Sequence, residues 1–348
     1  MTSPRWHLTR FDLWMNPIFD ETIRAEPSVS LEIAPIRETD KGWAALERAH
    51  VYQITAAKDE LGIQFRATQK LVERCPRLLC VSSAGAGYDT VDVEACTRAG
   101  IAVVSQLGGN ANSVGEMAIG LMLAVSRRIV ESDRKLRTQR GFSRESVMGS
   151  DIGGKVLGVV GIGYTGTRTA ALAKAFGMRV VAFDPFVAPE EIRRRGAEPV
   201  DLDTLVRSAD FVSLHCPRNK DTLNLFDAQR FASMKKGAIF VSTARGGIHD
   251  EQALTEAVVS GHLAGAGLDV WKEEPPALDH PLLALDNVVA TFHTAGVSHE
   301  GRRNVARMAA EQVLQLLRGE RPPHLINPQV WNVFLERRAE ALRSLRAA

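Results

Sequence analysis

Three chemically versatile side chains each follow a short apolar run in the C-terminal half of the sequence. Arg245 comes after residues 238–242, Glu274 follows the run that ends at 268, and His293 comes after residues 288–291. Each of these residues alone would more often have a structural role. Because the carboxyl ends of parallel strands meet at one edge of a sheet, however, the three together predict a ligand-binding edge that offers a proton, a carboxylate and a guanidinium.

A glycine-rich turn lies upstream of this set and predicts a nucleotide-binding unit. The apolar run 156–160 is typical of a buried parallel strand, and it is followed by Gly161, Gly163 and Gly166 and then by the helix-like stretch 165–176. In such a turn the first glycine permits the tight bend and the second lets the backbone approach a pyrophosphate. The third lets the helix pack closely on the strand, and the amides at the start of the helix receive the phosphates. An ordinary strand-turn-helix is the alternative.

Asp184 distinguishes between these two interpretations. It ends a second apolar run, 179–183, eighteen positions after Gly166, where a carboxylate would accept hydrogen bonds from the hydroxyls of the adenosine ribose. Pro185 and Phe186 follow, without an adjacent Arg to receive a 2′-phosphate. The sequence therefore predicts a βαβ unit that prefers NAD to NADP.

Composition sets broad limits on the class of protein. The chain of 348 residues is long enough for two domains, and 45% hydrophobic with 24% charged residues is typical of a soluble globular protein. A net charge of +2 gives no reason to expect a nucleic acid or an anionic membrane as partner. The four cysteines lack metal-ligand spacing, and no metal is expected. Without a signal-peptide pattern or a membrane-spanning run, a cytoplasmic location is expected.

Alternating strand and helix patterns predict an α/β fold. Strand-like runs are expected at 29–33, 51–54, 78–82, 101–104, 156–160, 180–183, 211–214, 238–242, 264–268 and 288–291, with helices between them. Ser113 and Glu116 form an apparent capping box before the apolar helix 117–130, which we expect to be buried between domains or at a subunit interface. The turn at 82–89 has backbone N–H groups that could bind a carboxylate, although an ordinary flexible turn is equally consistent with its sequence.

At this point the sequence resembles a known family, the D-isomer-specific 2-hydroxyacid dehydrogenases. The similarity extends from about residue 78 to 310, and it is greatest to the phosphoglycerate dehydrogenase and hydroxypyruvate/glyoxylate reductase branches. The segments that carry it occur in the family's order: residues 161–166, 184–185, 213–217, 243–247, 267–270, 274–275 and 293–296.

The resemblance implies a discontinuous arrangement of two domains. A Rossmann domain with a doubly wound parallel sheet, residues 113–298, would be inserted into a smaller flavodoxin-like α/β substrate domain made of residues 1–112 and 299–348. The active site would lie in the cleft between them, and closure would exclude water. The family's habit also favours a homodimer.

The resemblance also implies the chemistry, an NAD(H)-dependent conversion between a 2-hydroxy acid and a 2-keto acid. His293 would be the general acid and base, Glu274 its partner, and Arg245 the group that binds the substrate carboxylate and polarises the keto oxygen. The amides of Ala86 and Gly87 would hold the other side of that carboxylate. Cofactor contacts are expected from Val114, Gly161, Gly163, Tyr164, Thr165, Gly166, Asp184, Pro217, Thr222, Thr243, Ala244, Asp269 and Ala295.

Three residues depart from the family pattern. Phe292 stands where Pro commonly precedes the catalytic His, Gly115 stands where Ala is usual and is expected to loosen its helix, and His249 occupies a usually apolar place. We expect His249 to be exposed, with a polar contact to substrate as the alternative. These departures concern the choice of substrate and leave the expected chemistry intact.

The resemblance implies that residues 55–60 form the substrate loop. This segment offers only Lys58 as a cation, with Arg66 further along, so a phosphorylated substrate is not favoured. The length leaves no room for the C-terminal regulatory domain of some phosphoglycerate dehydrogenases, so feedback by serine is not expected. One other function stays open, an NAD(H)-sensing binding protein of the corepressor type, which could keep the same residues. Formate dehydrogenases replace the Glu partner of the His with Gln, so Glu274 argues against that function.

Overall fold

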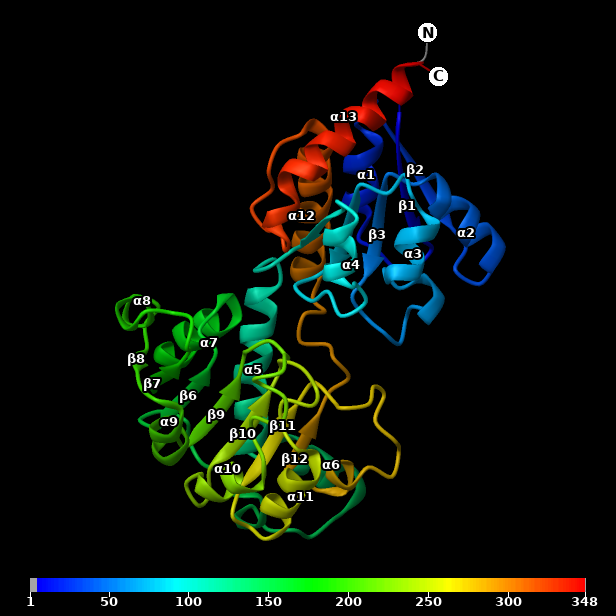
Figure 1. Ribbon diagram of the computed structural model, residues 1–348. Helices are drawn as coiled ribbons and strands as arrows, with labels where there is room; N and C mark the ends of the chain where they lie inside the picture. The colour runs from blue at the N-terminus through cyan, green and yellow to red at the C-terminus, as the bar shows by residue number, and fades with distance from the viewer. Residues whose placement is uncertain (1–4, 348) are drawn as a thin grey trace. The chain divides into compact units, whose positions relative to one another are not determined.

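The computed structural model describes residues 5–347, which fall into two compact units (Figure 1). Unit 1 contains the chain up to Asn110 together with the segment from His299 onward, and unit 2 is Ala111–Ser298. Each unit has its own parallel sheet covered by helices, which confirms the predicted α/β fold.

Unit 1 is built on a five-stranded parallel sheet in the order β2-β1-β3-β4-β5. The strands are β1 Trp6–Phe11, β2 Val29–Ala34, β3 Val51–Thr55, β4 Cys80–Ala84 and β5 Ala102–Ser105. The N-terminal segment supplies helices α1 Pro17–Arg24, α2 Thr39–Arg48, α3 Gln69–Arg74 and α4 Val93–Arg98 and the short turn η1 Ile63–Phe65. The C-terminal segment adds α12 His299–Arg318, η4 Pro328–Val330 and α13 Trp331–Ala347.

The two faces of this sheet bury different helices because side chains alternate along each strand. Leu8, Val51 and Cys80 form one apolar row across three neighbouring strands, and they belong to the same core as Ala306 and Val313 of α12. The residues one position further along the strands face a second core on the opposite side. The C-terminal helix α12 is therefore an integral part of the N-terminal unit.

The sequence prediction missed β1, α1 and α2. Strand β1 contains His7, Thr9 and Arg10, so it lacks the apolar run by which the other strands were predicted. It is nevertheless almost wholly buried, because Arg10 forms an ion pair with Asp20 of α1 at 2.6 Å and Thr9 donates to a backbone carbonyl of α2. Pairing between distant residues thus permits a polar strand in the middle of the sheet.

Unit 2 is built on a seven-stranded parallel sheet in the order β12-β11-β10-β9-β6-β7-β8. Its strands are β6 Val156–Val160, β7 Arg179–Phe183, β8 Glu198–Pro199, β9 Phe211–Leu214, β10 Ile239–Ser242, β11 Gly265–Leu268 and β12 Val288–Ala290. The helices are α5 Ala111–Ser126, α6 Ile129–Thr138, α7 Tyr164–Ala175, α8 Pro189–Arg194, α9 Leu202–Ser208, α10 Ala228–Ser233 and α11 Glu251–Val259, with the turns η2 Glu145–Val147 and η3 Pro281–Ala284. Apart from the two-residue β8, every strand was predicted to within one residue at either end.

Helix α5 differs from its prediction in four ways. It begins at Ala111, so Ser113 lies inside the helix and does not cap it; its hydroxyl lies 2.7 Å from that of Ser298. The apolar faces of α5 contact α7, β10 and β11 of the same unit, which explains its composition without a subunit interface. Gly115 does not loosen the helix: a Cβ there would come within 2.8 Å of Arg168 of α7, so glycine permits this close packing. The helix ends at Ser126, before Arg128 adopts a φ of 51°.

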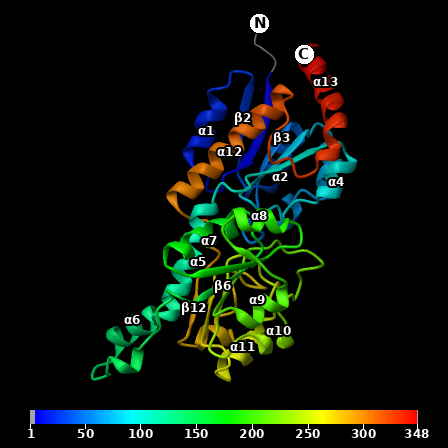
Figure 2. The same cartoon turned by 90° about the vertical axis from the view of Figure 1, so that its left-hand side faces the viewer.

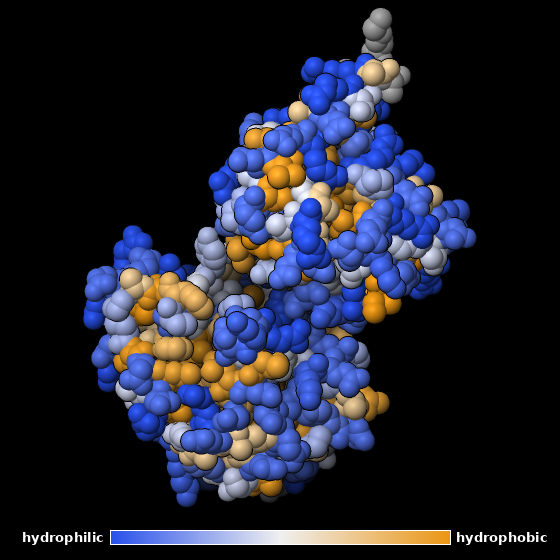
Figure 3. Space-filling model, in the orientation of Figure 1, coloured by the Kyte–Doolittle hydropathy of each residue, from blue (hydrophilic) through white to orange (hydrophobic). Residues whose placement is uncertain are grey.

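The segment that follows α5 extends away from the body of unit 2. Figure 2 shows α6 and the loop after it at the margin of this unit. The face of each unit drawn in Figure 3 is mainly hydrophilic, with apolar residues confined to smaller areas and a band across part of unit 2. Within residues 5–347, no helix is both long and apolar enough to span a membrane.

Candidate active site

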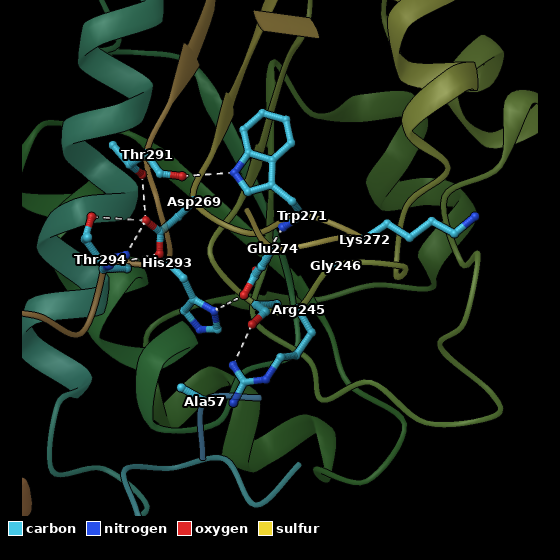
Figure 4. Close-up of polar contacts among 12 residues, drawn as sticks. Ala57, Arg245, Gly246, Asp269, Trp271, Lys272, Glu274, Thr291, His293 and Thr294 are labelled. Atoms are coloured by element: carbon cyan, nitrogen blue, oxygen red, sulfur yellow. Dashed lines mark hydrogen bonds and ion pairs between the residues drawn. The ribbon is translucent and has the colours of Figure 1, made fainter. Parts of the chain in front are cut away.

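The centre of the candidate site is a contact between an imidazole and a carboxylate on unit 2. His293 follows β12 and Glu274 follows β11, and these strands are neighbours in the sheet. His293 Nδ1 lies 2.8 Å from Glu274 Oε2, as Figure 4 shows. A carboxylate at this position favours the Nδ1–H tautomer and leaves Nε2 to meet a ligand. The side chain of His293 is 41% exposed and that of Glu274 is 21% exposed.

A buried carboxylate fixes the turn that carries His293. Asp269, at the end of β11, is completely buried and accepts hydrogen bonds from the hydroxyl of Thr291 at 2.6 Å and the amides of Thr294 at 2.8 Å and Ala295 at 2.9 Å. Its own carbonyl accepts from the amide of His293 at 2.7 Å. His293 itself has a φ of 48°, a conformation that costs a residue with a Cβ some energy. These bonds hold it there.

Trp271 fixes Glu274, the partner of His293. Its indole N–H donates to the carbonyl of Thr291 at 3.0 Å, and its amide donates to Glu274 Oε1 at 3.0 Å (Figure 4). One oxygen of Glu274 is thus held by the backbone and the other contacts His293. The carboxylate is positioned before any ligand arrives.

Arg245 follows β10, the next strand across the sheet, and is half-buried beside this pair. One of its guanidinium N–H groups donates to the carbonyl of Ala244 at 2.7 Å. Its positive charge acts on Glu274. The structure therefore brings together Arg245, Glu274 and His293, the three residues that the sequence predicted to share one edge.

The local electrostatics keep Glu274 ionised. Partial burial is the largest single influence and favours the neutral acid, but it is outweighed by the hydrogen bond and charge of His293, the amide of Trp271 and the charge of Arg245. Together these lower the pKa of Glu274 below its ordinary value of 4.5. At neutral pH the side chain is a carboxylate that can stabilise a protonated imidazole.

The glycine turn has the geometry that its three positions require. Gly161 has a φ of 90°, and a Cβ on it would lie 2.7 Å from the backbone of Cys216. A Cβ on Gly166 would overlap the carbonyl oxygen of Gly161, so this glycine is what lets α7 pack against the turn. Gly163, at the N-cap of α7, has open space at the Cβ position. A phosphate could approach the backbone there.

Asp184 braces this turn at the end of β7. One carboxylate oxygen accepts from the amide of Ile162 and the other from the amide of Phe186, both at 3.0 Å. A second contact was not predicted from the sequence: Arg195 donates to the carbonyl of Ile162 at 2.6 Å and pairs with Glu191. Because Arg195 lies eleven positions beyond Asp184, in the turn after α8, no local motif pointed to it.

The remaining predicted cofactor residues line the same edge of unit 2. Thr243 is buried, and its hydroxyl is without a partner in the described part of the chain, so a ligand group could use it. The hydroxyl of Thr222 donates to the carbonyl of Pro217 at 2.7 Å and closes the loop after β9. Val114 and Ala244 are almost fully buried, and Tyr164 is 57% exposed at the start of α7 beside Thr165. These residues and the open turn fit an extended dinucleotide.

The predicted carboxylate-binding turn belongs to unit 1. It follows β4 and is held by Gln106, whose side chain accepts from the amide of Gly85 at 2.9 Å, while Ser83 donates to the carbonyl of Gly87 at 2.8 Å. No internal acceptor for the amides of Ala86 and Gly87 is found in residues 5–347. They are therefore available to a ligand.

The expectation for His249 was wrong. It is only 1% exposed, its ring contacts Phe240 at 5.3 Å between centroids, and both ring nitrogens are buried without a partner in the described part of the chain. Burial lowers its pKa to about 4. It packs as a neutral core residue. Within residues 5–347, no three His, Cys, Asp or Glu side chains are grouped so that they could hold a metal ion.

Comparison with known proteins agrees with this geometry. Residues 119–295 match the family described as D-isomer specific 2-hydroxyacid dehydrogenase, NAD binding domain. The chain is 42% identical over 256 residues to a D-3-phosphoglycerate dehydrogenase of Archaeoglobus fulgidus. The match covers 74% of this chain but only 48% of that relative, so the chain spans about half of the relative's length. It is 39% identical over 267 residues to a glyoxylate reductase of Korarchaeum cryptofilum, covering 76% of this chain and 80% of that one.

A solved structure extends the similarity to the whole fold. The D-lactate dehydrogenase of Aquifex aeolicus, in complex with NAD and lactic acid, superposes with a TM-score of 0.76 at 25% identity and covers 90% of this chain and 96% of that one. The family match spans about half of the chain, and its description confirms NAD as the predicted cofactor. This chain belongs to the D-isomer-specific 2-hydroxyacid dehydrogenase family.

Proposed function

We propose that this protein is an NAD(H)-dependent D-2-hydroxyacid dehydrogenase that works mainly as a 2-keto acid reductase. The observation that carries the proposal is the 2.8 Å contact of His293 with Glu274, on the same sheet edge as Arg245 and the glycine turn. An acid–base group, a carboxylate-binding group and a dinucleotide turn are the parts that this reaction needs. The names of the relatives agree with the same reaction class.

In the proposed reduction, bound NADH supplies the hydride that adds to the keto carbon. His293, protonated at Nε2, donates a proton to the keto oxygen, which becomes the hydroxyl, and the imidazole is left neutral. Glu274 stabilises the cationic imidazole before this transfer and keeps Nδ1 protonated after it. Arg245 holds the substrate carboxylate through its planar guanidinium and polarises the keto oxygen. The oxidation uses the same groups in reverse.

The proposed roles of the two units follow from these groups. Unit 2 would hold the cofactor through the turn at Gly161–Gly166 and through Asp184, whose oxygens would turn from backbone amides to the ribose hydroxyls. Unit 1 would hold the substrate carboxylate through the amides of Ala86 and Gly87, whose N–H groups have no internal acceptor in the described chain. Asp269, already bonded to the turn that carries His293, would also lie near the nicotinamide carboxamide.

We further propose that the protein is a homodimer, although α5 no longer supports this. The support comes from the projecting segment around α6, where the apolar side chains of Ile129, Leu136 and Met148 are 53%, 65% and 67% exposed. A second copy of the chain could cover them.

The proposed activity is tested by following NADH consumption with a panel of 2-keto acids that includes glyoxylate, pyruvate, hydroxypyruvate, 2-ketobutyrate, oxaloacetate and phosphohydroxypyruvate. Turnover of at least one is expected, with little activity on the phosphorylated acid. NADH binding without turnover of any panel member would instead favour the NAD(H)-sensing binding protein. That second function has no separate structural observation in its favour.

A further inference from the structure

A small cavity in unit 1 lies at the carboxyl ends of three neighbouring strands. Its volume is about 40 Å³, enough for a few water molecules or one small functional group. Gln53 and Thr55 of β3, Ala84 of β4, Trp14 and Arg302 are among the residues that line it. Ala84 directly precedes the turn that contains Ala86 and Gly87, so the cavity adjoins the proposed carboxylate-binding turn within the same unit.

Two of the lining residues, Arg10 and Gln53, belong to a polar row across the sheet. Arg10 of β1, Gln53 of β3 and Ser82 of β4 are aligned in register, two positions beyond the apolar row that packs on α12. Because neighbouring residues in register point to the same side of a parallel sheet, the three share the face covered by α12. If this end of the sheet served only to pack against α12, apolar residues would be expected at these three positions.

Gln53 is the member of this row whose polar atoms are left unused. Arg10 is fully engaged: it forms two hydrogen bonds to Asp20, at 2.9 and 2.6 Å, and donates to the carbonyls of Phe11 and Leu13. Gln53 is only 3% exposed, and neither its Nε2 nor its Oε1 has a partner among residues 5–347. Burying an amide without partners is costly, so a group that enters the cavity and bonds to Gln53 would be stabilised.

The free atoms of Gln53 define which group fits. The amide offers one donor side and one acceptor side, and a hydroxyl can bond to both because it donates and accepts. A carboxylate would leave Oε1 unpaired, and an alkyl group would leave both atoms unpaired. The charge of Arg10 is balanced by Asp20, so of the two arginines that line the cavity only Arg302 could attract an anionic group.

We propose that this cavity is the subsite for the distal end of the substrate, and that Gln53 makes the enzyme prefer 2-keto acids whose distal end carries a hydroxyl. The inference rests on the proposed function, because it takes the substrate carboxylate to be held at Ala86 and Gly87. From that anchor the remainder of a short acid extends toward Ala84 and the cavity. Gln53 is then a specificity-determining residue, with no part in proton or hydride transfer.

The test compares pairs of substrates that differ by one hydroxyl: hydroxypyruvate with pyruvate, and 2-keto-4-hydroxybutyrate with 2-ketobutyrate. In the wild type, kcat/KM should be higher for the hydroxylated member of at least one pair. Gln53→Leu, or Gln53→Met as a second replacement of similar length, should lower this ratio by about tenfold or more, because the bonds to the hydroxyl are lost. Oxaloacetate tests whether Arg302 attracts an anionic end instead.

A matched control exists in the same unit. Gln312 of α12 is also 3% exposed with an unpartnered Oε1, but it donates to the carbonyl of Ser105 and does not line the cavity. Gln312→Leu should therefore leave the substrate ratio unchanged. An equal fall of the ratio in both variants would show a general effect of core substitution and would overturn the proposal.

The remaining outcomes distinguish failure of the subsite proposal from failure of the proposed function. If the wild type turns over 2-keto acids and Gln53→Leu leaves the ratio unchanged, or if oxaloacetate is the preferred substrate, the subsite proposal is wrong and the dehydrogenase stands. If the wild type turns over nothing, the proposed function fails, and thermal stabilisation measured with NADH present then decides on the subsite. D-glycerate should stabilise the wild type more than D-lactate does and lose this advantage in Gln53→Leu; equal stabilisation would overturn the proposal.

Discussion

At the scale of single residues, the acidic side chains near the candidate site differ in what occupies their oxygens. Asp269 is saturated by the turn it holds, Glu274 shares its oxygens between Trp271 and His293, and Asp184 accepts one backbone amide on each oxygen. The sequence showed all three as acids after strands, but their different surroundings depend on contacts between segments far apart in the chain. The sequence therefore predicted that these acids follow strands, but it did not predict which groups their oxygens would bind.

Asp184→Ala tests the cofactor assignment at this scale. Removal of the carboxylate takes away the acceptor for the ribose hydroxyls, so NADH affinity should fall by about tenfold and its advantage over NADPH should narrow. Isothermal titration with both cofactors measures this. Asp201→Ala is a matched control, because Asp201 likewise accepts a backbone amide, from Thr204 at the start of α9, and should leave cofactor affinity unchanged. A wild type that prefers NADPH would contradict the assignment.

His249 makes a prediction about acid stability. Burial holds its pKa in the folded protein at about 4, below the ordinary 6.5, so between these values the unfolded chain binds more protons. Neutral His249 therefore makes its full contribution to the free energy of unfolding above pH 6.5. This contribution falls by roughly 3 kcal/mol as the pH drops from 6.5 to 4. The melting temperature of His249→Leu, followed from pH 7 to 4, should therefore decline less than that of the wild type. Parallel declines would show that His249 does not carry this dependence.

At the scale of elements, the predictable parts were those set by local sequence. The strands of unit 2 are short apolar runs ended by polar residues, and α10 and α11 are capped by Asp227 and Asp250, a residue type that favours this position. The wrong predictions involve tertiary contacts. Ser113 has the pattern of a cap yet lies inside α5, and the polar strand β1 is stabilised by Asp20 from α1.

The glycine turn lets α7 pack closely and leaves space for a pyrophosphate, and substitutions at two of its glycines separate these two roles. Gly166→Ala places a methyl group on the carbonyl oxygen of Gly161, so the turn must shift, and both thermal stability and NADH binding should fall. Gly163→Ala meets no protein atom within 4 Å and has an ordinary φ of −69°, so the fold should remain intact. NADH affinity should nevertheless fall several-fold, because the methyl group occupies the path of the pyrophosphate. If Gly163→Ala bound NADH as tightly as the wild type, the phosphates would not approach at this position.

At the scale of the whole molecule, the sequence pointed to two domains, and the structure resolves two compact units with one inserted in the other. Family resemblance supplied this insertion; composition and periodicity alone could not, because the contact of α12 with the N-terminal sheet joins segments more than 200 residues apart. The assignment of cofactor to unit 2 and substrate to unit 1 remains a prediction that depends on both units acting together. Gln53 lay outside every motif, and the cavity beside it could be found only in three dimensions.

The most direct test of the account is the rate of NADH-dependent 2-keto acid reduction by the wild type and by His293→Gln, with NADH affinity measured in both. The wild type should reduce at least one acid of the panel. The substitution should lower kcat by about 10²–10⁴-fold, because the proton donor to the keto oxygen is lost, while NADH affinity stays the same. A His293→Gln variant as active as the wild type would remove His293 from the mechanism, and a wild type that binds NADH without reducing any acid would contradict the proposed reaction.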